Sequence, residues 1–130
     1  MHAYVDTSVL VSIYFADANY SKYIKSLKKY NDIYSSILLE AELCSVVARE
    51  EKNLDLVEKV LSNIQIFSPN KSILPECERV LSHGYLRGAD LYHLACALAI
   101  DPSALEMDFI SADKKQIKIA KSLGFKTLSY

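Results

Sequence analysis

At 130 residues the chain has the length of one ordinary domain, and its hydrophobic fraction of 51% is typical of a packed globular protein and excludes a disordered one. The net charge of −1 excludes binding to nucleic acid through overall positive charge, so any such binding must use a local basic surface. With no repeat, low-complexity stretch or linker, we expect a single domain over residues 1–130.

The first predicted elements are a strand and two helices. Residues 2–6 form a short apolar run that ends in the carboxylate of Asp6, which is typical of a buried strand. The hydroxyl residues Thr7 and Ser8 follow and are typical caps for a helix over residues 9–15. A second helix is expected over residues 20–30, with its lysines on a solvated face.

The central part of the chain predicts two strands and two helices. A strand is expected at residues 32–36. The segment 37–51 is apolar almost all round, which predicts a helix that is buried on several sides. An amphipathic helix over residues 53–64 and a short strand over residues 65–67 follow it.

The C-terminal part alternates in the same way. Its predicted helices and strands are helix 73–86, helix 88–100, strand 108–111, helix 113–123 and strand 126–128. Asp101 and Pro102 stop the second of these helices, and Gly124 closes the third. Strands that alternate with helices predict an α/β fold with a largely parallel sheet.

The cysteines bear on the compartment. Cys44, Cys77 and Cys96 are widely separated, odd in number and lack CxxC spacing. With no signal peptide and no apolar run of the roughly 18–20 residues that a membrane span needs, we expect buried thiols in a cytoplasmic protein without membrane contact. Cys, His and acidic residues do not cluster at zinc-finger spacing, so structural zinc is not expected.

Four carboxylates stand at positions that the predicted fold can bring together. Asp6 and Asp113 each lie between the end of a predicted strand and the start of a helix, Asp90 opens another helix, and Glu42 lies early in a buried one. Ligands of open α/β sheets bind beyond the carboxyl ends of the strands, so these groups can converge on one edge. An all-oxygen set suits Mg²⁺ or Mn²⁺ rather than zinc or copper.

Each of these carboxylates also has a structural interpretation. Asp6, Asp90 and Asp113 stand where a helix N-cap is wanted, and Asp is among the best N-cap residues. Glu42 shares a narrow polar stripe of its helix, and Glu40 on the far side is a rival for the same role. Periodicity alone leaves the choice between the two glutamates open.

Four segments carry a resemblance to a known family. They are YVDTSVL at 4–10, SILLEAEL at 36–43, GADLYHLACAL at 88–98 and FISAD at 109–113. In this order, and over nearly the whole chain, they resemble the PIN domain, in particular VapC-type toxins of toxin–antitoxin pairs. The third is the most specific, because the family's third acid heads a helix of the form Asp-x-x-His-x-Ala. The comparison selects Glu42 over Glu40. It fits less well at the fourth acid, where Ala112 precedes Asp113 and Asp108 is a nearby competitor.

The resemblance implies a fold, an activity and partners. The fold is a three-layer α/β/α sandwich with a central, largely parallel sheet. The activity is Mg²⁺- or Mn²⁺-dependent endoribonuclease cleavage of RNA, with Asp6, Glu42, Asp90 and Asp113 as catalytic and metal-binding residues. The implied partners are a second copy of the chain and a small antitoxin that blocks the site.

Other residues near these acids are candidates for supporting roles. Ser8 and Ser111 are expected to donate hydrogen bonds that orient the carboxylates, although a serine there can also simply cap a helix. Arg87, Lys114 and Lys115 adjoin the proposed ligands and are candidates for contact with RNA phosphates, or else ordinary surface charge. His93, one turn after Asp90, is interpreted as a satisfied core residue and not as a metal ligand.

Three alternatives compete with the toxin hypothesis. One is a PIN-domain nuclease that processes RNA without being a toxin. Another is a catalytically inactive PIN-like module, which the presence of all four acids argues against. The third is a receiver-like phosphorylation switch, which generally has an acidic pair after its first strand, where this chain has Asp6 followed by Thr7 and Ser8.

Overall fold

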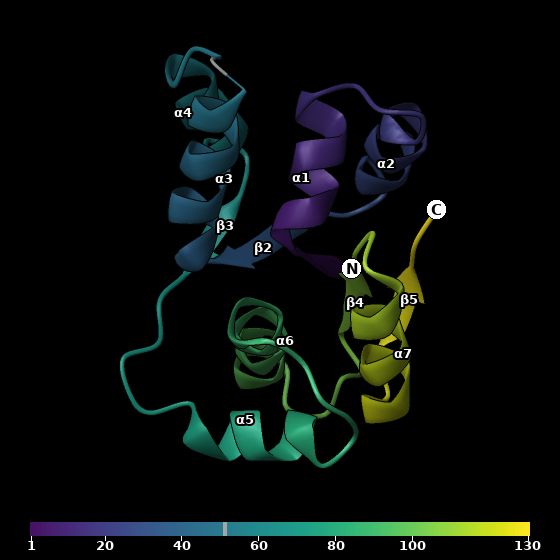
Figure 1. Ribbon diagram of the computed structural model, residues 1–130. Coiled ribbons are helices and arrows are strands. Elements are labelled where there is room, and N and C mark those ends of the chain that lie inside the picture. The colour runs from purple at the N-terminus through teal and green to yellow at the C-terminus, as the bar shows by residue number, and fades with distance from the viewer. Residues whose placement is uncertain (51) are drawn as a thin grey trace.

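A computed structural model describes residues 1–50 and 52–130. Its five strands pair in parallel to form one sheet in the order β3-β2-β1-β4-β5 (Figure 1). The strands are β1 His2–Val5, β2 Asp32–Ser36, β3 Gln65–Phe67, β4 Met107–Ile110 and β5 Lys126–Leu128. The predicted α/β fold with a parallel sheet is confirmed.

Helices cover both faces of this sheet and form the outer layers of an α/β/α sandwich (Figure 1). The helices are α1 Thr7–Tyr14, α2 Tyr20–Leu27, α3 Leu38–Arg49, α4 Asp55–Leu61, α5 Leu74–Leu81, α6 Gly88–Ile100 and α7 Lys114–Leu123. The end predicted at residue 51 for the third helix lies outside the described residues. The helix predicted over 73–86 was too long, because α5 ends at Leu81 and the chain turns so that Leu86 reaches the core.

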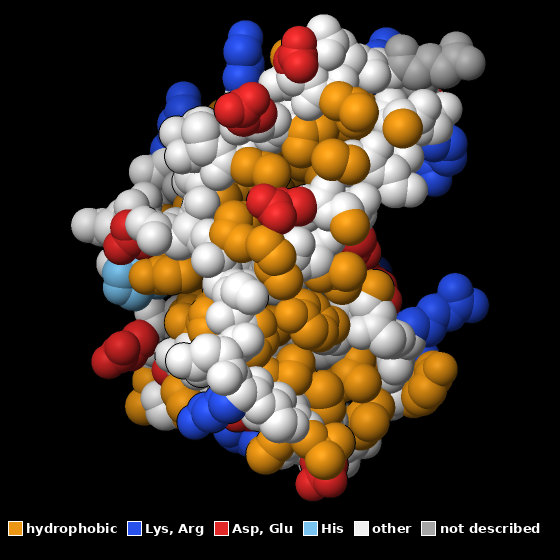
Figure 2. All heavy atoms as spheres, turned by 90° about the vertical axis from the view of Figure 1, so that its left-hand side faces the viewer, with side chains coloured by type: hydrophobic (Ala, Val, Ile, Leu, Met, Phe, Trp, Pro, Cys, Tyr) orange, Lys and Arg blue, Asp and Glu red, His pale blue; other side chains and the backbone are white. Residues whose placement is uncertain are grey.

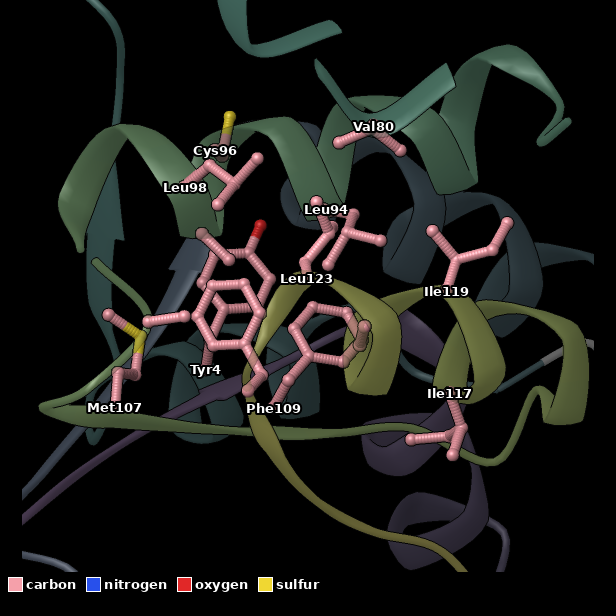
Figure 3. Close-up of a cluster of buried hydrophobic side chains, with 14 of the residues drawn as sticks. Tyr4, Val80, Leu94, Cys96, Leu98, Met107, Phe109, Ile117, Ile119 and Leu123 are labelled. Atoms are coloured by element: carbon pink, nitrogen blue, oxygen red, sulfur yellow. The ribbon is translucent and has the colours of Figure 1, made fainter. Parts of the chain in front are cut away.

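The side chains of β1 alternate between two cores, as the period of a strand requires. Ala3 and Val5 pack with Ile110 in a core beneath α1 to α4. Tyr4 and Phe109 face the opposite side, where their rings stack at a centroid distance of 5.5 Å in the core beneath α5 to α7 (Figure 3). Burial of both faces explains why the two central strands, β1 and β4, are mostly apolar.

The strand order creates a switch point at one edge of the sheet, and the region beyond the carboxyl ends of β1 and β4 is called the crevice below. From β1 the chain runs outward to β2 and β3 on one side, and β4 and β5 lie on the other. The connections after β1 and β4 therefore leave in opposite directions. The place between these two strands, where the direction of the connections reverses, is the switch point, and open α/β sheets bind ligands there. The order also contradicts the receiver-like alternative, whose strands follow 2-1-3-4-5.

The cysteines are free thiols, and only Cys96 is buried, whereas Cys44 and Cys77 are half-buried. The expectation of three buried thiols was therefore wrong for two of them, because both lie on helix faces that the core does not fully cover. In the described part of the chain, no helix combines the length and apolarity that crossing a bilayer requires.

Candidate active site

Asp6 lies at the switch point, directly after β1, and only 3% of its surface is exposed. It occupies the N-cap position of α1 but makes no side-chain cap hydrogen bond of ordinary geometry. Instead, Ser8 Oγ donates to one carboxylate oxygen, and Ser111 Oγ lies 2.7 Å from the other. Burial raises the pKa of Asp6, and the two hydroxyl donors oppose that rise.

Ser8 and Ser111 lie where the sequence analysis placed donors to a carboxylate. Ser8 also accepts a hydrogen bond from the backbone N–H of Ala112 at 2.9 Å, which ties the start of α1 to the loop after β4. Ser111 accepts from the backbone N–H of Asp113 at 2.9 Å. Each serine therefore joins the connection after β1 to the connection after β4, and neither caps a helix.

Glu42 on α3 reaches the same edge of the sheet. Its Oε1 accepts a hydrogen bond from Thr7 Oγ1 at 2.7 Å and lies 2.8 Å from His93 Nε2. Burial raises the pKa of Glu42, but the hydrogen bonds from His93 and Thr7 outweigh it, so the pKa of Glu42 is lowered overall. Glu40, its rival, is exposed and lines a groove between α3 and α4. The structure thus brings Glu42, and not Glu40, to the crevice.

His93 is a buried link between Glu42 and the core. Because a carboxylate only accepts, His93 Nε2 carries a proton in the contact with Glu42. The other ring nitrogen, Nδ1, lies 2.8 Å from the hydroxyl of Tyr4 and accepts from it when the ring is neutral. The interpretation of His93 as a satisfied core residue agrees with these contacts, which also hold Glu42 in one orientation.

Asp90 is the third residue of α6, and Arg87 is the N-cap. Capping is therefore the wrong interpretation for Asp90, whose side chain is half-buried. Burial raises the pKa of Asp90, and the negative charges of Asp113 and Glu42 raise it further.

Asp113 does cap a helix, as one interpretation of the sequence proposed. Its Oδ1 accepts from the backbone N–H groups of Lys115 at 2.9 Å and Gln116 at 3.2 Å, at the start of α7. The competitor Asp108 lies within β4 and accepts a hydrogen bond from Tyr30. Asp113 is consequently the acid that stands at the carboxyl end of β4.

Sequence reasoning missed three polar residues around these carboxylates. Thr7 donates to Glu42, Tyr4 contacts His93, and the third is Gln116. Gln116 is fully buried; its Nε2 donates to the backbone carbonyl of Asp90 at 3.0 Å, and its Oε1 lies 2.9 Å from Ser111 Oγ. It therefore joins the loop after β4 to the first turn of α6. The available signal was a glutamine among the apolar residues of the buried face of α7.

The three basic candidates lie at the starts of α6 and α7, close in sequence to Asp90 and Asp113. Arg87 is the N-cap of α6, and Lys114 and Lys115 are the first two residues of α7. All three side chains are exposed. Phosphate contact by these residues stays a prediction.

The chemistry of the site fits a divalent cation, although the carboxylates do not form a ready-made cluster of ligands. Among residues 1–50 and 52–130, no three His, Cys, Asp or Glu side chains are grouped so that they could hold a metal ion. Asp6, Glu42 and Asp113 each have at least one oxygen engaged by its own hydrogen-bond donors. However, the group offers oxygen ligands only, and burial together with the negative charges of Asp113 and Glu42 raises the pKa of Asp90. Excess negative charge of this kind is what Mg²⁺ or Mn²⁺ relieves.

Known proteins share this fold along nearly the whole chain. The structure is similar to that of VapBC-1 from nontypeable Haemophilus influenzae, with a TM-score of 0.73 and 13% identity over 99% of this chain and 98% of that chain. It is also similar to VapBC2 from Rickettsia felis, solved with a DNA fragment from their promoter, with a TM-score of 0.66 and 19% identity over 100% of this chain and 99% of that chain.

The sequence comparisons give the family. No curated protein sequence matches the chain. The profile of the PIN domain family matches residues 3–122. This span contains β2, β3, β4, all of β1 but its first residue, and each of the four carboxylates. This chain therefore belongs to the PIN domain family.

Proposed function

We propose that this protein is an endoribonuclease that depends on Mg²⁺ or Mn²⁺ and acts as the toxin of a toxin–antitoxin pair. The observation that carries the proposal is a set of hydrogen bonds at the switch point of a PIN-domain sheet. Asp6 accepts from Ser111, two residues before Asp113, and Glu42 contacts His93, three residues after Asp90. Asp6 and Glu42 are held there by donors from other elements, so their orientation is set before a substrate binds.

Hydrolysis of a phosphodiester needs an activated water and relief of the negative charge that develops on the phosphate. A bound divalent ion would supply both. Asp6 and Asp90 would bind the central ion, and Asp113 would complete the site directly or through water. Glu42 is suited to orient the attacking water, because its lowered pKa keeps it ionised and the described hydrogen bonds engage only its Oε1.

Metal dependence is the first test. Mn²⁺ or Mg²⁺ is expected to support cleavage of a labelled single-stranded RNA, and excess EDTA is expected to stop it, because the proposed ligands are all carboxylates. Product would be measured on denaturing gels. Adding Mn²⁺ in excess of the chelator should restore the rate, which controls for damage to the protein. Cleavage that continues undiminished in EDTA would contradict the metal mechanism.

An exposed apolar face supports the proposed protein partners. Figure 2 shows hydrophobic side chains gathered over α3, α4 and the segment that leads to α5. The exposed large side chains of this region include Ile37, Leu54 and Leu74, and large exposed apolar patches mark interaction surfaces. We therefore propose a homodimer and a small antitoxin, as the VapBC names of the structural neighbours suggest. Because the proposed substrate is RNA, the proposed location is the cytoplasm.

The homodimer leads to a second prediction. The pure protein is expected to sediment as a dimer at micromolar concentration, because the apolar face would otherwise remain in contact with water. A reducing agent should not change the sedimentation coefficient, since all three cysteines are free. A monomer at this concentration would contradict the dimer without affecting the nuclease proposal.

A further inference from the structure

We propose that Tyr85 and the lysine-bearing face of α7 form a subsite for single-stranded RNA beside the catalytic carboxylates. In this subsite a base would stack on the ring of Tyr85, and Lys118 would contact a neighbouring phosphate. The proposal rests on the proposed function, because it names how the substrate is held next to the site. It goes beyond the basic candidates Arg87, Lys114 and Lys115.

The exposed face of α7 carries a local excess of positive charge. Its four lysines, Lys114, Lys115, Lys118 and Lys121, are exposed, and the helix contains no acidic residue. None of the ion pairs found among the described residues involves them. In a chain of net charge −1, this face is thus a local basic surface of the kind that a polyanion binds.

Two adjoining hollows follow this face. One, of about 240 Å³, is lined by residues that include His83, Tyr85 and Lys115. The other, of about 450 Å³, extends along α7 to β5 and is lined by Leu128, among others. Lys118 lines both hollows, so its side chain stands between them. A positive charge therefore borders each hollow, in a place where a phosphate of a bound strand would meet it.

Tyr85 presents an exposed ring from a fixed position. Its surface is 67% exposed, although the next residue, Leu86, is buried in the core. The preceding residue, Gly84, lies so close to α7 that a Cβ there would stand 3.0 Å from Ile119. The backbone on both sides of Tyr85 is therefore packed while the ring is largely exposed. The ammonium of Lys115 lies over the ring, 5.0 Å from its centroid, so a base would stack on the opposite face. An exposed aromatic ring beside a cation is the usual platform for an unpaired base.

The subsite borders the candidate active site through two elements. Lys115 donates its backbone N–H to Asp113 Oδ1. Tyr85 lies two residues before Arg87, which is the N-cap of the helix that carries Asp90. RNA bound along α7 would consequently reach the carboxylates within a few nucleotides. The exposed ring favours RNA over an acidic peptide, which would use the lysines but not the stacking surface.

Binding of a labelled decamer of uridylate, measured by fluorescence anisotropy in EDTA, tests the subsite without cleavage. Tyr85→Ala is expected to raise Kd by about 5- to 150-fold, the loss typical of one base–aromatic stack. Tyr85→Phe keeps the ring and should stay within about twofold of the parent, because the π-face is retained. Tyr20→Ala removes another exposed tyrosine, on α2, and should leave Kd unchanged.

The phosphate contact is tested through salt. Lys118→Gln is expected to reduce the slope of log Kd against log salt by about 0.7, the value for one phosphate contact on a single strand. Lys25→Gln, an exposed lysine on α2, is the matched control and should leave the slope unchanged.

The outcomes separate this subsite from the nuclease proposal. If the parent binds no uridylate, or Tyr85→Ala binds as tightly as the parent, the subsite is wrong even where the parent cleaves RNA in Mn²⁺. If Tyr85 controls binding but the parent cleaves no RNA, the subsite stands and the nuclease proposal fails. An oligoglutamate peptide that displaces uridylate at equal concentration and depends equally on Tyr85 would overturn RNA in favour of a protein partner.

Discussion

Asp6→Asn and Asp90→Asn are each expected to reduce RNA cleavage by about 1,000-fold or more, which corresponds to about 4 kcal/mol of lost transition-state stabilisation. Asn keeps the shape of the side chain and loses its charge, so the proposed cation would lose a ligand while the fold is kept. At position 6 the amide oxygen can still accept a hydrogen bond from Ser8 or Ser111. Initial rates on labelled RNA measure the loss, and circular dichroism checks that each variant is folded.

The two glutamates of α3 provide a matched control for that experiment. Glu42→Gln removes the charge that Thr7 and His93 hold in the crevice, and it should be as inactive as the aspartate variants. Glu40→Gln makes the same chemical change two residues earlier on an exposed side chain, and it should retain the parent's rate. The reverse pattern would show that Glu40 is the functional glutamate, and activity in Asp6→Asn would remove Asp6 from the site.

Asp90→Asn is also expected to melt at a higher temperature than the parent in EDTA. Coulomb's law gives about 4 kcal/mol for two carboxylates ~4 Å apart at an effective dielectric near 20, and partial exposure reduces this repulsion to the order of 1 kcal/mol. A change of this size corresponds to roughly 3–5 °C in Tm for a chain of this length. An acid in the first turn of α6 has an opposing, favourable dipole interaction, so a lower Tm would show that repulsion is not the larger effect.

The stability difference between Asp90→Asn and the parent is expected to depend on pH with a definite sign. Because the folded-state pKa of Asp90 is raised, its ionised form destabilises the folded protein at neutral pH. This destabilisation is fully present at pH values above the folded-state pKa of Asp90. It disappears as the pH falls towards the pKa that Asp90 has in the unfolded state. The Tm difference between Asp90→Asn and the parent should therefore be largest near neutral pH and shrink in acid. Glu40→Gln, which removes an exposed charge, should show no such trend.

The metal response gives an independent check on Asp90. Mg²⁺ or Mn²⁺ should raise the Tm of the parent, because a ligand stabilises only the state that it binds. Asp90→Asn should lose most of this increase. An equal response in the two proteins would exclude Asp90 from the cation site, whatever their difference in EDTA.

Local signals in the sequence determined whether each element is a helix or a strand. They also determined several of the boundaries between elements. The strands at 32–36, 65–67 and 126–128 and the helix at 88–100 were predicted at their observed bounds. Asp101 ends that helix and Gly124, in the left-handed region, ends α7. Such signals suffice because the spacing of apolar residues and the capping residues at helix ends are both read from a few neighbouring positions. The end of the predicted helix 73–86 was wrong because packing of Leu86, and no local signal, decides where α5 stops.

The candidate carboxylates could also be named from the sequence, but their surroundings could not. Thr7 meets Glu42 across 35 residues of sequence, and Asp6 meets Ser111 across 105. Whether a helix-start Asp caps its helix or enters the crevice depends on these distant partners, which is why the same residue type accepts side-chain cap hydrogen bonds of ordinary geometry at position 113 and not at position 6. Strand order, the shift of Asp90 into the first turn of α6 and the burial of Gln116 were likewise decided only by tertiary structure. Each depends on the free energy of packing segments far apart in the chain, and short-range pattern carries no information about that free energy.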